Sequence, residues 1–215
     1  MVQSSPAWSV VVPVKRLDAA KTRLGDDHRP SRAALALAFA TDCLTALAEA
    51  SRVTRIVVVS SEPALRPVVS ALGVQWLEEV SAAGLNPAAA SALTHLDGPV
   101  AVVVGDLPCL TPSAADLALG LADAVPLGFI SDAAGVGTTM LMAHEARRCT
   151  PRFGSRSRAR HRSVGFVDLG LDTAPDRDTA RELARARRDV DTEVDLADAL
   201  RLGVGAATAR ALRLP

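Results

Sequence analysis

The stretch AVVVGDLPCL, residues 101–110, decides the fold. Its first four residues are apolar, and this pattern is typical of a strand buried on both faces of a parallel sheet. Gly105 and Asp106 follow at once, although buried strands avoid a carboxylate. Ligands of open parallel sheets bind at the carboxyl ends of the strands, so the pattern predicts a binding site at Asp106. An aspartate that only caps the next turn is the alternative.

Similar apolar runs alternate with alanine- and leucine-rich segments along the chain. The apolar runs cover residues 10–14, 55–60, 74–77 and 100–105, and the helical segments cover 30–50, 62–72, 86–96 and 113–123. This alternation predicts an α/β fold with a largely parallel sheet. Two short runs at 126–132 and 137–143 flank a glycine-containing turn, which predicts a hairpin and therefore a mixed sheet. A strand at 164–169, a helix at 175–188 and a last helix from about Glu193 complete the expected order.

Length and composition favour one domain. The 215 residues, 49% of them hydrophobic, suffice for one large core and are short for two. We therefore expect a single domain over residues 1–215, with 203–215 as a loosely packed C-terminal tail. The 24 basic and 24 acidic residues cancel, which excludes a global attraction to nucleic acid or to an anionic membrane. The chain has no cationic leader and no run of ~18 apolar residues, so we expect a cytoplasmic protein with no membrane partner.

A second acidic group lies in DVDTEVD, which begins at Asp189. Asp189 and Asp191 alternate with Val190, so in an extended segment both carboxylates point to one side. Such oxygen ligands, with positions left open, are what Mg²⁺ prefers when it also holds substrate phosphates. The alternative is a solvated turn that caps the following helix through Asp191 or Thr192. For Asp195 we favour this capping role, because a carboxylate in the first turn also complements the helix dipole.

Two segments could bind a phosphate or a carboxylate. Lys15 and Lys21 are the only lysines and lie close together in VVPVKRLDAAKTRL, which fits a local need for a compact ammonium group, although chance spacing is the alternative. The segment TPRFGSRSRARHRS contains Gly154 and Ser157, whose backbone N–H groups and hydroxyl suit an anion. A solvated basic loop is equally compatible with it, whereas RNA binding would require more aromatic residues. His161 lies in this segment and is a further candidate.

Six motifs follow one another in a fixed order: VPVKRLDAAKTRL, GLN at 84–86, GDLP at 105–108, DAAGVGTTML at 132–141, PRFGSRSRARH at 151–161 and DVDTEVDL at 189–196. Together they span nearly the whole chain and resemble the 2-phospho-L-lactate guanylyltransferase family (CofC/FbiD-like). The actinobacterial branch of that family is a phosphoenolpyruvate guanylyltransferase of coenzyme F-420 biosynthesis. The resemblance implies a three-layer α/β/α, Rossmann-like nucleotidyltransferase of the GT-A type that uses GTP and Mg²⁺.

The resemblance also implies roles for particular residues. The metal ligands would be Asp106, Asp189 and Asp191, and the catalytic residues would be Lys15, Asp106 and Asp191. The nucleotide would contact Pro13, Lys15, Lys21, Arg23, Gly84 and Asn86. Thr138 or Thr139, together with Gly154 and Ser157, would hold the phosphorylated three-carbon acid. A downstream transferase would then consume the product.

Several functions stay open at this stage. Another GT-A nucleotidyltransferase, acting on a sugar phosphate or a molybdenum cofactor, would have a glycine-rich opening where this chain has VPVKRLDAAKTRL. A non-catalytic nucleotide-binding protein of this fold would lack part of the carboxylate set, whereas all three aspartates are present here. The sequence does not separate phosphoenolpyruvate from 2-phospho-L-lactate as the acceptor. We prefer phosphoenolpyruvate because the arginine- and alanine-rich composition is typical of actinobacterial proteins.

Overall fold

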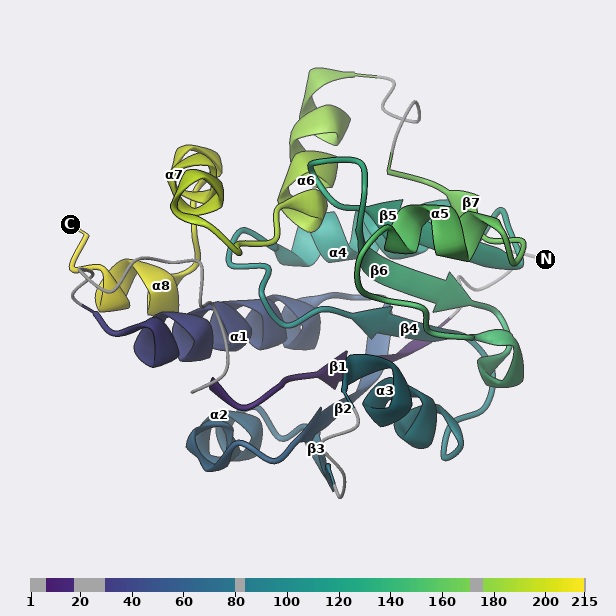
Figure 1. Cartoon of the computed structure of the whole chain (residues 1–215), viewed down its shortest axis with the longest axis horizontal. Coiled ribbons are helices and arrows are strands. Elements are labelled where there is room, and N and C mark those ends of the chain that lie inside the picture. The colour runs from purple at the N-terminus through teal and green to yellow at the C-terminus, as the bar shows by residue number, and fades with distance from the viewer. Residues whose placement is uncertain (1–6, 18–29, 80–83, 171–175, 215) are drawn as a thin grey trace.

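A mixed seven-stranded sheet organises the computed structural model, which describes residues 7–17, 30–79, 84–170 and 176–214 (Figure 1). The strands are β1 (Trp8–Pro13), β2 (Val53–Ser60), β3 (Gln75–Glu78), β4 (Val100–Val103), β5 (Leu127–Ser131), β6 (Thr138–Ala143) and β7 (Val167–Asp168). Their order in the sheet is β3-β2-β1-β4-β6-β5-β7. Strands β1 to β4 pair in parallel, β6 is antiparallel to β4 and β5, and β7 is parallel to β5. The predicted mixed, mostly parallel sheet is confirmed.

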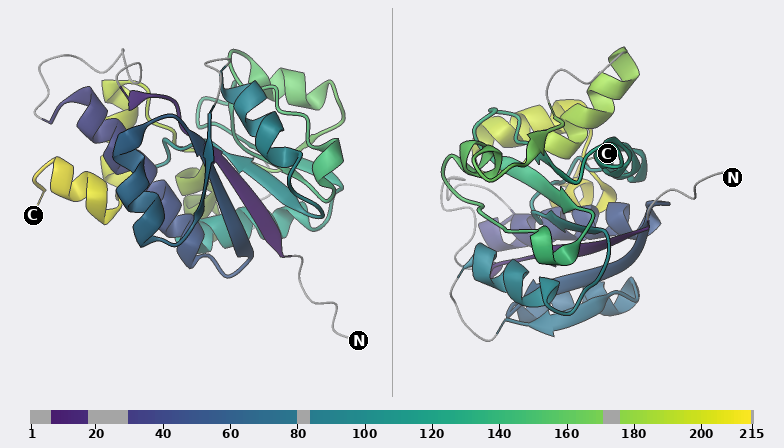
Figure 2. Two further views of the ribbon diagram at one scale, coloured as in Figure 1. Left: turned by 90° about the horizontal axis from the view of Figure 1, so that it is seen from below. Right: turned by 90° about the vertical axis from the view of Figure 1, so that its right-hand side faces the viewer.

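Helices cover both faces of this sheet (Figure 2). On β1, Val10 and Val12 join one apolar cluster and Val11 joins another, because successive side chains of a strand point to opposite faces. The first cluster includes residues of α1 (Arg32–Glu49), α2 (Arg66–Ala71), α4 (Pro112–Ala122) and α6 (Arg177–Arg187). The second includes α3 (Leu85–Leu93) and the rings around α5 (Ser157–Arg162). The predicted α/β/α layers are therefore confirmed. No helix of the described residues is long and apolar enough to cross a membrane.

The helix starts follow local signals that the sequence contains. Ser31 accepts a hydrogen bond from the Ala34 N–H at the start of α1, and Thr111 accepts one from Ala114 at the start of α4. The expected helix at 62–72 is instead a short 3₁₀ turn, Pro63–Leu65, followed by α2. A 3₁₀ turn at Ala146–Arg148 and the helix α5 were also not expected.

The expected strand at 164–169 is only two residues long. The N–H groups of Val164 and Phe166 both donate to the His161 carbonyl, so they end α5 instead of extending the sheet. Strand pairing therefore begins only at Val167. The basic segment that was predicted as a loop thus contains a helix. The turn that ends this helix includes the first residues of the expected strand.

The prediction of a loosely packed tail at 203–215 is wrong for its described part. Helix α7 (Glu193–Leu202) forms a third apolar cluster with α1, and residues that flank α8 (Ala206–Ala211) pack against this cluster. Helix α8 itself lies alongside α1 (Figure 1). Asp42 of α1 is only 6% exposed, and its carboxylate accepts hydrogen bonds from the Ala207 N–H at 2.8 Å and the Thr208 N–H at 2.9 Å. The sequence could not show this attachment, because its anchor lies more than 160 positions earlier in the chain.

Candidate functional site

A cavity of about 300 Å³ opens at the carboxyl ends of β1 and β4. Both strand ends, α1, the start of α3 and the segment before α7 contribute to its wall. The lining residues are Pro13, Val14, Lys15, Leu17, Ala36, Ala40, Leu85, Val104, Gly105, Asp106 and Asp191. The charged side chains among them are Lys15, Asp106 and Asp191. The structure thus brings one ammonium group and two carboxylates, predicted from three separate motifs, to a single volume.

A larger cavity of about 570 Å³ lies at the opposite edge of the sheet. Its wall contains Asp97, just before β4, and Glu145, just after β6. The Glu145 carboxylate is paired with the guanidinium of Arg147. We favour the smaller cavity as the functional site, because it lies where parallel sheets bind their ligands and it gathers the predicted residues.

Gly105 lets β1 and β4 approach each other at the smaller cavity. A Cβ atom at this position would lie 3.0 Å from Cγ2 of Val14, which is closer than side chains normally come. Any larger residue would therefore require the Val14 side chain, next to Lys15, to shift. The glycine before the aspartate is thus explained by this approach of the two strand ends.

The segment that carries Asp189 and Asp191 is attached directly to Asp106. The Val190 N–H donates to the backbone carbonyl of Asp106 at 3.2 Å, and the Val190 side chain is fully buried in the cluster with Leu35 and other residues of α1 and α7. Asp191 is exposed and faces the cavity, whereas Asp189 is half-buried beside it. The alternation of the three residues therefore buries the valine and leaves the two aspartates toward the surface.

Two of the three predicted metal ligands line the same cavity. In the part of the chain that the structure describes, no three or more side chains of His, Cys, Asp or Glu are gathered closely enough to hold a metal ion by themselves. Of the predicted set, Asp106 and Asp191 share the cavity, and Asp189 does not line it. Mg²⁺ is usually bound through one or two carboxylates together with phosphate and water oxygens. Two carboxylates that face one phosphate-sized cavity fit an ion of this kind.

Asp195 has the capping role that the sequence favoured. Its carboxylate accepts hydrogen bonds from the Thr192 N–H at 2.9 Å and the Thr192 hydroxyl at 2.8 Å, and its own N–H donates to Thr192 Oγ1, so the two residues form a capping box on α7. Burial alone would raise the pKa of Asp195. These hydrogen bonds and the Arg188 guanidinium outweigh burial, and they lower that pKa.

Asn86 connects α3 to the basic segment. Its Oδ1 accepts from the Phe153 N–H at 2.7 Å, and its Nδ2 donates to the Phe153 carbonyl at 3.0 Å. Gly84, just before α3, has a φ of 97°, a left-handed conformation that favours glycine. Both residues lie beside Leu85 of the cavity wall. The amide that was predicted to contact nucleotide is therefore occupied in positioning the segment around Gly154.

His161 is a buried structural residue. It is fully buried, and its ring lies 5.3 Å from that of Phe153 and 5.8 Å from those of Phe129 and Phe166. Burial, with a smaller contribution from Arg152, lowers the pKa of His161 to about 4. Its Nε2 accepts the Arg152 N–H at 3.0 Å, so the neutral ring carries its proton on Nδ1.

The predicted acceptor residues are not gathered as one group. Thr138 is buried, and its Oγ1 lies 2.9 Å from Nδ1 of His161. Thr139 is fully buried on the other face of the sheet, and its hydroxyl donates to the Ala186 carbonyl at 2.8 Å. The two alternatives for the acceptor site thus lie on opposite faces of the sheet, because neighbouring residues of a strand point to opposite sides.

Gly154 and Ser157 lie at the start of α5, and Lys21 and Arg23 lie outside the described residues. Gly154 has a φ of 112°, and its carbonyl accepts the Ser157 N–H at 3.0 Å. Ser157 is only 2% exposed.

Arg187 is a residue that the sequence analysis missed. Its side chain donates hydrogen bonds to three backbone carbonyls. The available signal was its position just before the acidic segment.

Comparisons with known proteins show the family of this chain. The family model described as guanylyl transferase CofC like matches residues 8–164. Phosphoenolpyruvate guanylyltransferases of Streptomyces avermitilis and Streptomyces scabiei are 41% and 42% identical, and each match covers 95% of this chain and 93% or 95% of the relative.

Solved structures share the fold at low identity. A nucleotidyl transferase from Methanothermobacter has a TM-score of 0.60 and 14% identity, with coverage of 91% of this chain and 98% of that one. A Mycobacterium tuberculosis protein in complex with manganese has a TM-score of 0.51 and 15% identity, with the same coverage. The family match and the close relatives together decide the assignment: the chain belongs to the CofC-like guanylyltransferase family.

Proposed function

We propose that this protein transfers GMP from GTP to the phosphate of a phosphorylated three-carbon acid and releases pyrophosphate, as a step of coenzyme F-420 biosynthesis. The observation that carries this proposal is the cavity at the ends of β1 and β4, where Lys15, Asp106 and Asp191 meet in a chain of the guanylyltransferase family. Phosphoenolpyruvate is the preferred acceptor, with 2-phospho-L-lactate as the alternative. The two Streptomyces relatives support this preference, because both are named phosphoenolpyruvate guanylyltransferases.

The reaction needs no protein nucleophile. A phosphate oxygen of the acceptor attacks the α-phosphorus of GTP, the new P–O bond forms, and the bond to the bridging oxygen breaks as pyrophosphate leaves. The acceptor phosphate is already ionised near neutral pH, so no general base is required. Both reactants are polyanions, and the protein must therefore supply positive charge and fixed geometry. The Lys15 ammonium, exposed at the cavity wall, would contact the triphosphate.

Asp106 and Asp191 would hold Mg²⁺, with Asp189 as a third ligand. The ion would neutralise the phosphates and orient the attacking and leaving oxygens. Hard carboxylate oxygens suit Mg²⁺, and Mn²⁺ is a close substitute in such sites. The manganese complex of a structural neighbour is compatible with this choice. The attachment of Val190 to the Asp106 carbonyl would keep the carboxylates together before the ion arrives.

The remaining predicted residues divide between nucleotide and acceptor. Pro13 and Gly84 flank the cavity and would contact the nucleotide, to which Lys21 and Arg23 would add positive charge. Gly154 and Ser157 would bind the acceptor through backbone N–H groups or the serine hydroxyl. The Asn86 amide would act by holding Phe153 and, through it, this acceptor segment. We place the reaction in the cytoplasm, with a downstream transferase that consumes the phosphoanhydride product.

Pyrophosphate release from GTP tests the proposal. The purified protein would be incubated with GTP, Mg²⁺ and either phosphoenolpyruvate or 2-phospho-L-lactate, with a pyrophosphatase present to draw the reaction forward, and the product would be identified by mass. Glucose 1-phosphate serves as a control acceptor for the sugar-nucleotide alternative. Release with phosphoenolpyruvate and a product of the expected mass would support the proposal. Release only with the sugar phosphate would contradict it.

A further inference from the structure

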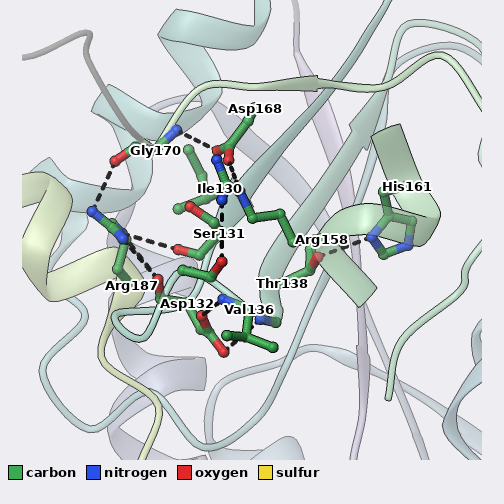
Figure 3. A network of polar contacts seen from close by, with 12 residues as sticks. Ile130, Ser131, Asp132, Val136, Thr138, Arg158, His161, Asp168, Gly170 and Arg187 are labelled. Carbon is green, nitrogen blue, oxygen red and sulfur yellow. Dashed lines mark hydrogen bonds and ion pairs between the residues drawn. The ribbon is translucent and has the colours of Figure 1, made fainter. Parts of the chain in front are cut away.

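Arg187, the last residue of α6, connects this helix to the β5–β6 hairpin (Figure 3). Its Nη2 donates to the Asp132 carbonyl at 2.8 Å, and its Nη1 donates to the Gly170 carbonyl at 3.0 Å. Its Nε lies within 3.1 Å of the Ser131 carbonyl and 3.2 Å of the Asp132 carbonyl. All three acceptors are backbone atoms at the ends of strands β5 and β7: Ser131 is the last residue of β5, Asp132 follows it, and Gly170 lies two residues after β7. The planar guanidinium therefore fixes the end of α6 against two strand ends at once.

The hairpin also satisfies the last carbonyl groups of α6. The end of a helix leaves carbonyls without partners inside the helix. Here the Thr139 hydroxyl donates to the Ala186 carbonyl at 2.8 Å, and the Ala133 N–H donates to the Arg187 carbonyl at 2.8 Å. Because Thr139 and Ala186 are both fully buried, the hydrogen bond between them is shielded from water.

The β5–β6 hairpin is itself held by several hydrogen bonds, so it can fix the position of the end of α6. The Asp132 carboxylate accepts the N–H groups of Val136 at 2.8 Å and Gly137 at 2.7 Å across the turn. Arg158 of α5 donates to the Gly135 carbonyl at 3.2 Å and pairs with Asp168 at 2.7 Å. Figure 3 shows the contact of Arg158 with Asp168 and that of Asp132 with Val136. The turn is thus attached to α5 on one side and to α6 on the other.

Only one residue separates Arg187 from Asp189. The acidic segment is therefore held on both sides, by the hairpin at Arg187 and by the Asp106 carbonyl at Val190. A shift of the α6 end would move Asp189 and Asp191 relative to Asp106. Metal sites are sensitive to such shifts, since partners outside the ligand shell commonly change metal affinity or activity by about 10–100-fold.

We infer that Arg187 and the Thr139 hydroxyl are positioning residues that set the Asp189–Asp191 segment for metal and triphosphate, and that the Thr139 side chain does not bind the acceptor. This inference rests on the proposed function of the cavity. The inference can be tested separately from the choice of acceptor, because the position of the carboxylates affects metal–nucleotide binding in the absence of any acceptor. An acceptor ligand would instead affect only the acceptor KM.

The test compares Thr139→Val with Thr139→Ser and adds Arg187→Lys. Valine keeps the shape and removes the hydroxyl, serine restores the hydroxyl, and lysine keeps the charge without the planar fork. Binding of Mn²⁺ with GTP, measured by the paramagnetic resonance signal of free Mn²⁺ and without acceptor, is the first readout. We expect about 10–100-fold weaker binding for Thr139→Val and Arg187→Lys, and near-normal binding for Thr139→Ser. The acceptor KM of active variants should change far less.

Arg52→Lys is the matched control. Arg52 is also a partly buried arginine, paired with Asp123 at 2.7 Å, but it lies at the amino end of β2, away from the cavity. It should lose stability without losing Mn²⁺–GTP binding. Normal binding by Thr139→Val, together with a raised acceptor KM, would overturn the inference. If Arg187→Lys fails to fold, the valine and serine pair at Thr139 decides the question.

The same experiment separates this inference from the proposed function. If the wild-type protein binds no Mn²⁺–GTP, the proposed function and this inference both fall. If the wild type binds it and both variants bind it equally well, only the inference falls. If wild type and variants differ as expected but neither three-carbon acid is converted, the positioning role stands and the acceptor assignment falls.

Discussion

Acidification should destabilise this protein through His161 before the carboxylates begin to titrate. The ring is fully buried among three phenylalanine rings, and both of its nitrogens already have partners, the Arg152 N–H and the Thr138 hydroxyl. Burial lowers its pKa from 6.5 to about 4. The folded protein therefore keeps the neutral ring while the unfolded chain takes up a proton. The stabilising contribution is complete above pH 6.5 and is lost as the pH falls toward 4.

The expected loss of unfolding free energy follows from the difference between the two pKa values of His161. One pKa unit corresponds to about 1.4 kcal/mol, so a shift from 6.5 to about 4 corresponds to about 3 kcal/mol at most. This is a large fraction of the stability of a typical domain, which is about 5–15 kcal/mol. The lowered pKa values of Asp116, Glu182 and Asp195 act in the same direction, but they act below the ordinary pKa of a carboxyl group. The slope between pH 6.5 and about 4.5 thus belongs mainly to histidine.

Urea unfolding at a series of pH values would measure the free energy of unfolding for the wild type, His161→Gln and His95→Gln. Replacing His161 should lower stability at pH 7, because the buried Thr138 hydroxyl and the Arg152 N–H lose their partner, and the difference from wild type should shrink as the pH falls. His95 is exposed, so its replacement should leave the slope unchanged. Parallel curves for the wild type and His161→Gln between pH 6.5 and 4.5 would refute the reasoning.

Four further substitutions test the site and the contacts that support it. Asp106→Asn and Asp191→Asn should each lower turnover by several orders of magnitude with an unchanged melting temperature, and a near-normal rate of pyrophosphate release would remove that residue from the metal site. Asn86→Ala should lower the free energy of unfolding by about 2 kcal/mol, since it removes two hydrogen bonds of about 1 kcal/mol each, and an unchanged urea midpoint would argue against this link. Gly205→Ala should cost about 1–3 kcal/mol in the same assay, because its Cβ would overlap the Asp42 carboxylate; wild-type stability would show that α8 can shift freely.

The sheet and the position of the cavity could be predicted because both depend on local patterns. Val10 to Val12 and Ala101 to Val103 are apolar on both faces, which is the pattern of central parallel strands. The Gly105–Asp106 pair marks the end of one such strand. Since neighbouring parallel strands end at the same edge, Lys15 after β1 was expected near Asp106, and both line the cavity. Helix starts at Ser31 and Thr111 were likewise local signals.

Other features depend on contacts between distant residues, and the sequence did not contain them in readable form. Asp42 reads as a polar position in α1, yet its carboxylate holds the start of α8. His161 reads as part of a basic, anion-binding loop, yet three phenylalanines from separate segments bury it. Asn86 reads as a nucleotide ligand, yet its amide is paired with Phe153. The partners of Asp42 and Asn86 are far away in the sequence, and Phe129 of the His161 cluster lies on a separate strand, so local propensity does not predict these contacts.

Thr138 and Thr139 are the two alternatives that the resemblance left open for the acceptor site. Adjacent residues of a strand point to opposite faces, so only one of the two hydroxyls can face the acceptor. The rule does not say which threonine faces which side. The neighbours decide that: His161 lies over Thr138, and the end of α6 lies over Thr139. Because that same helix end leads into the acidic segment, the Thr139 hydroxyl acts on the nucleotide side of the reaction, and its loss should be felt in metal binding before any acceptor is present.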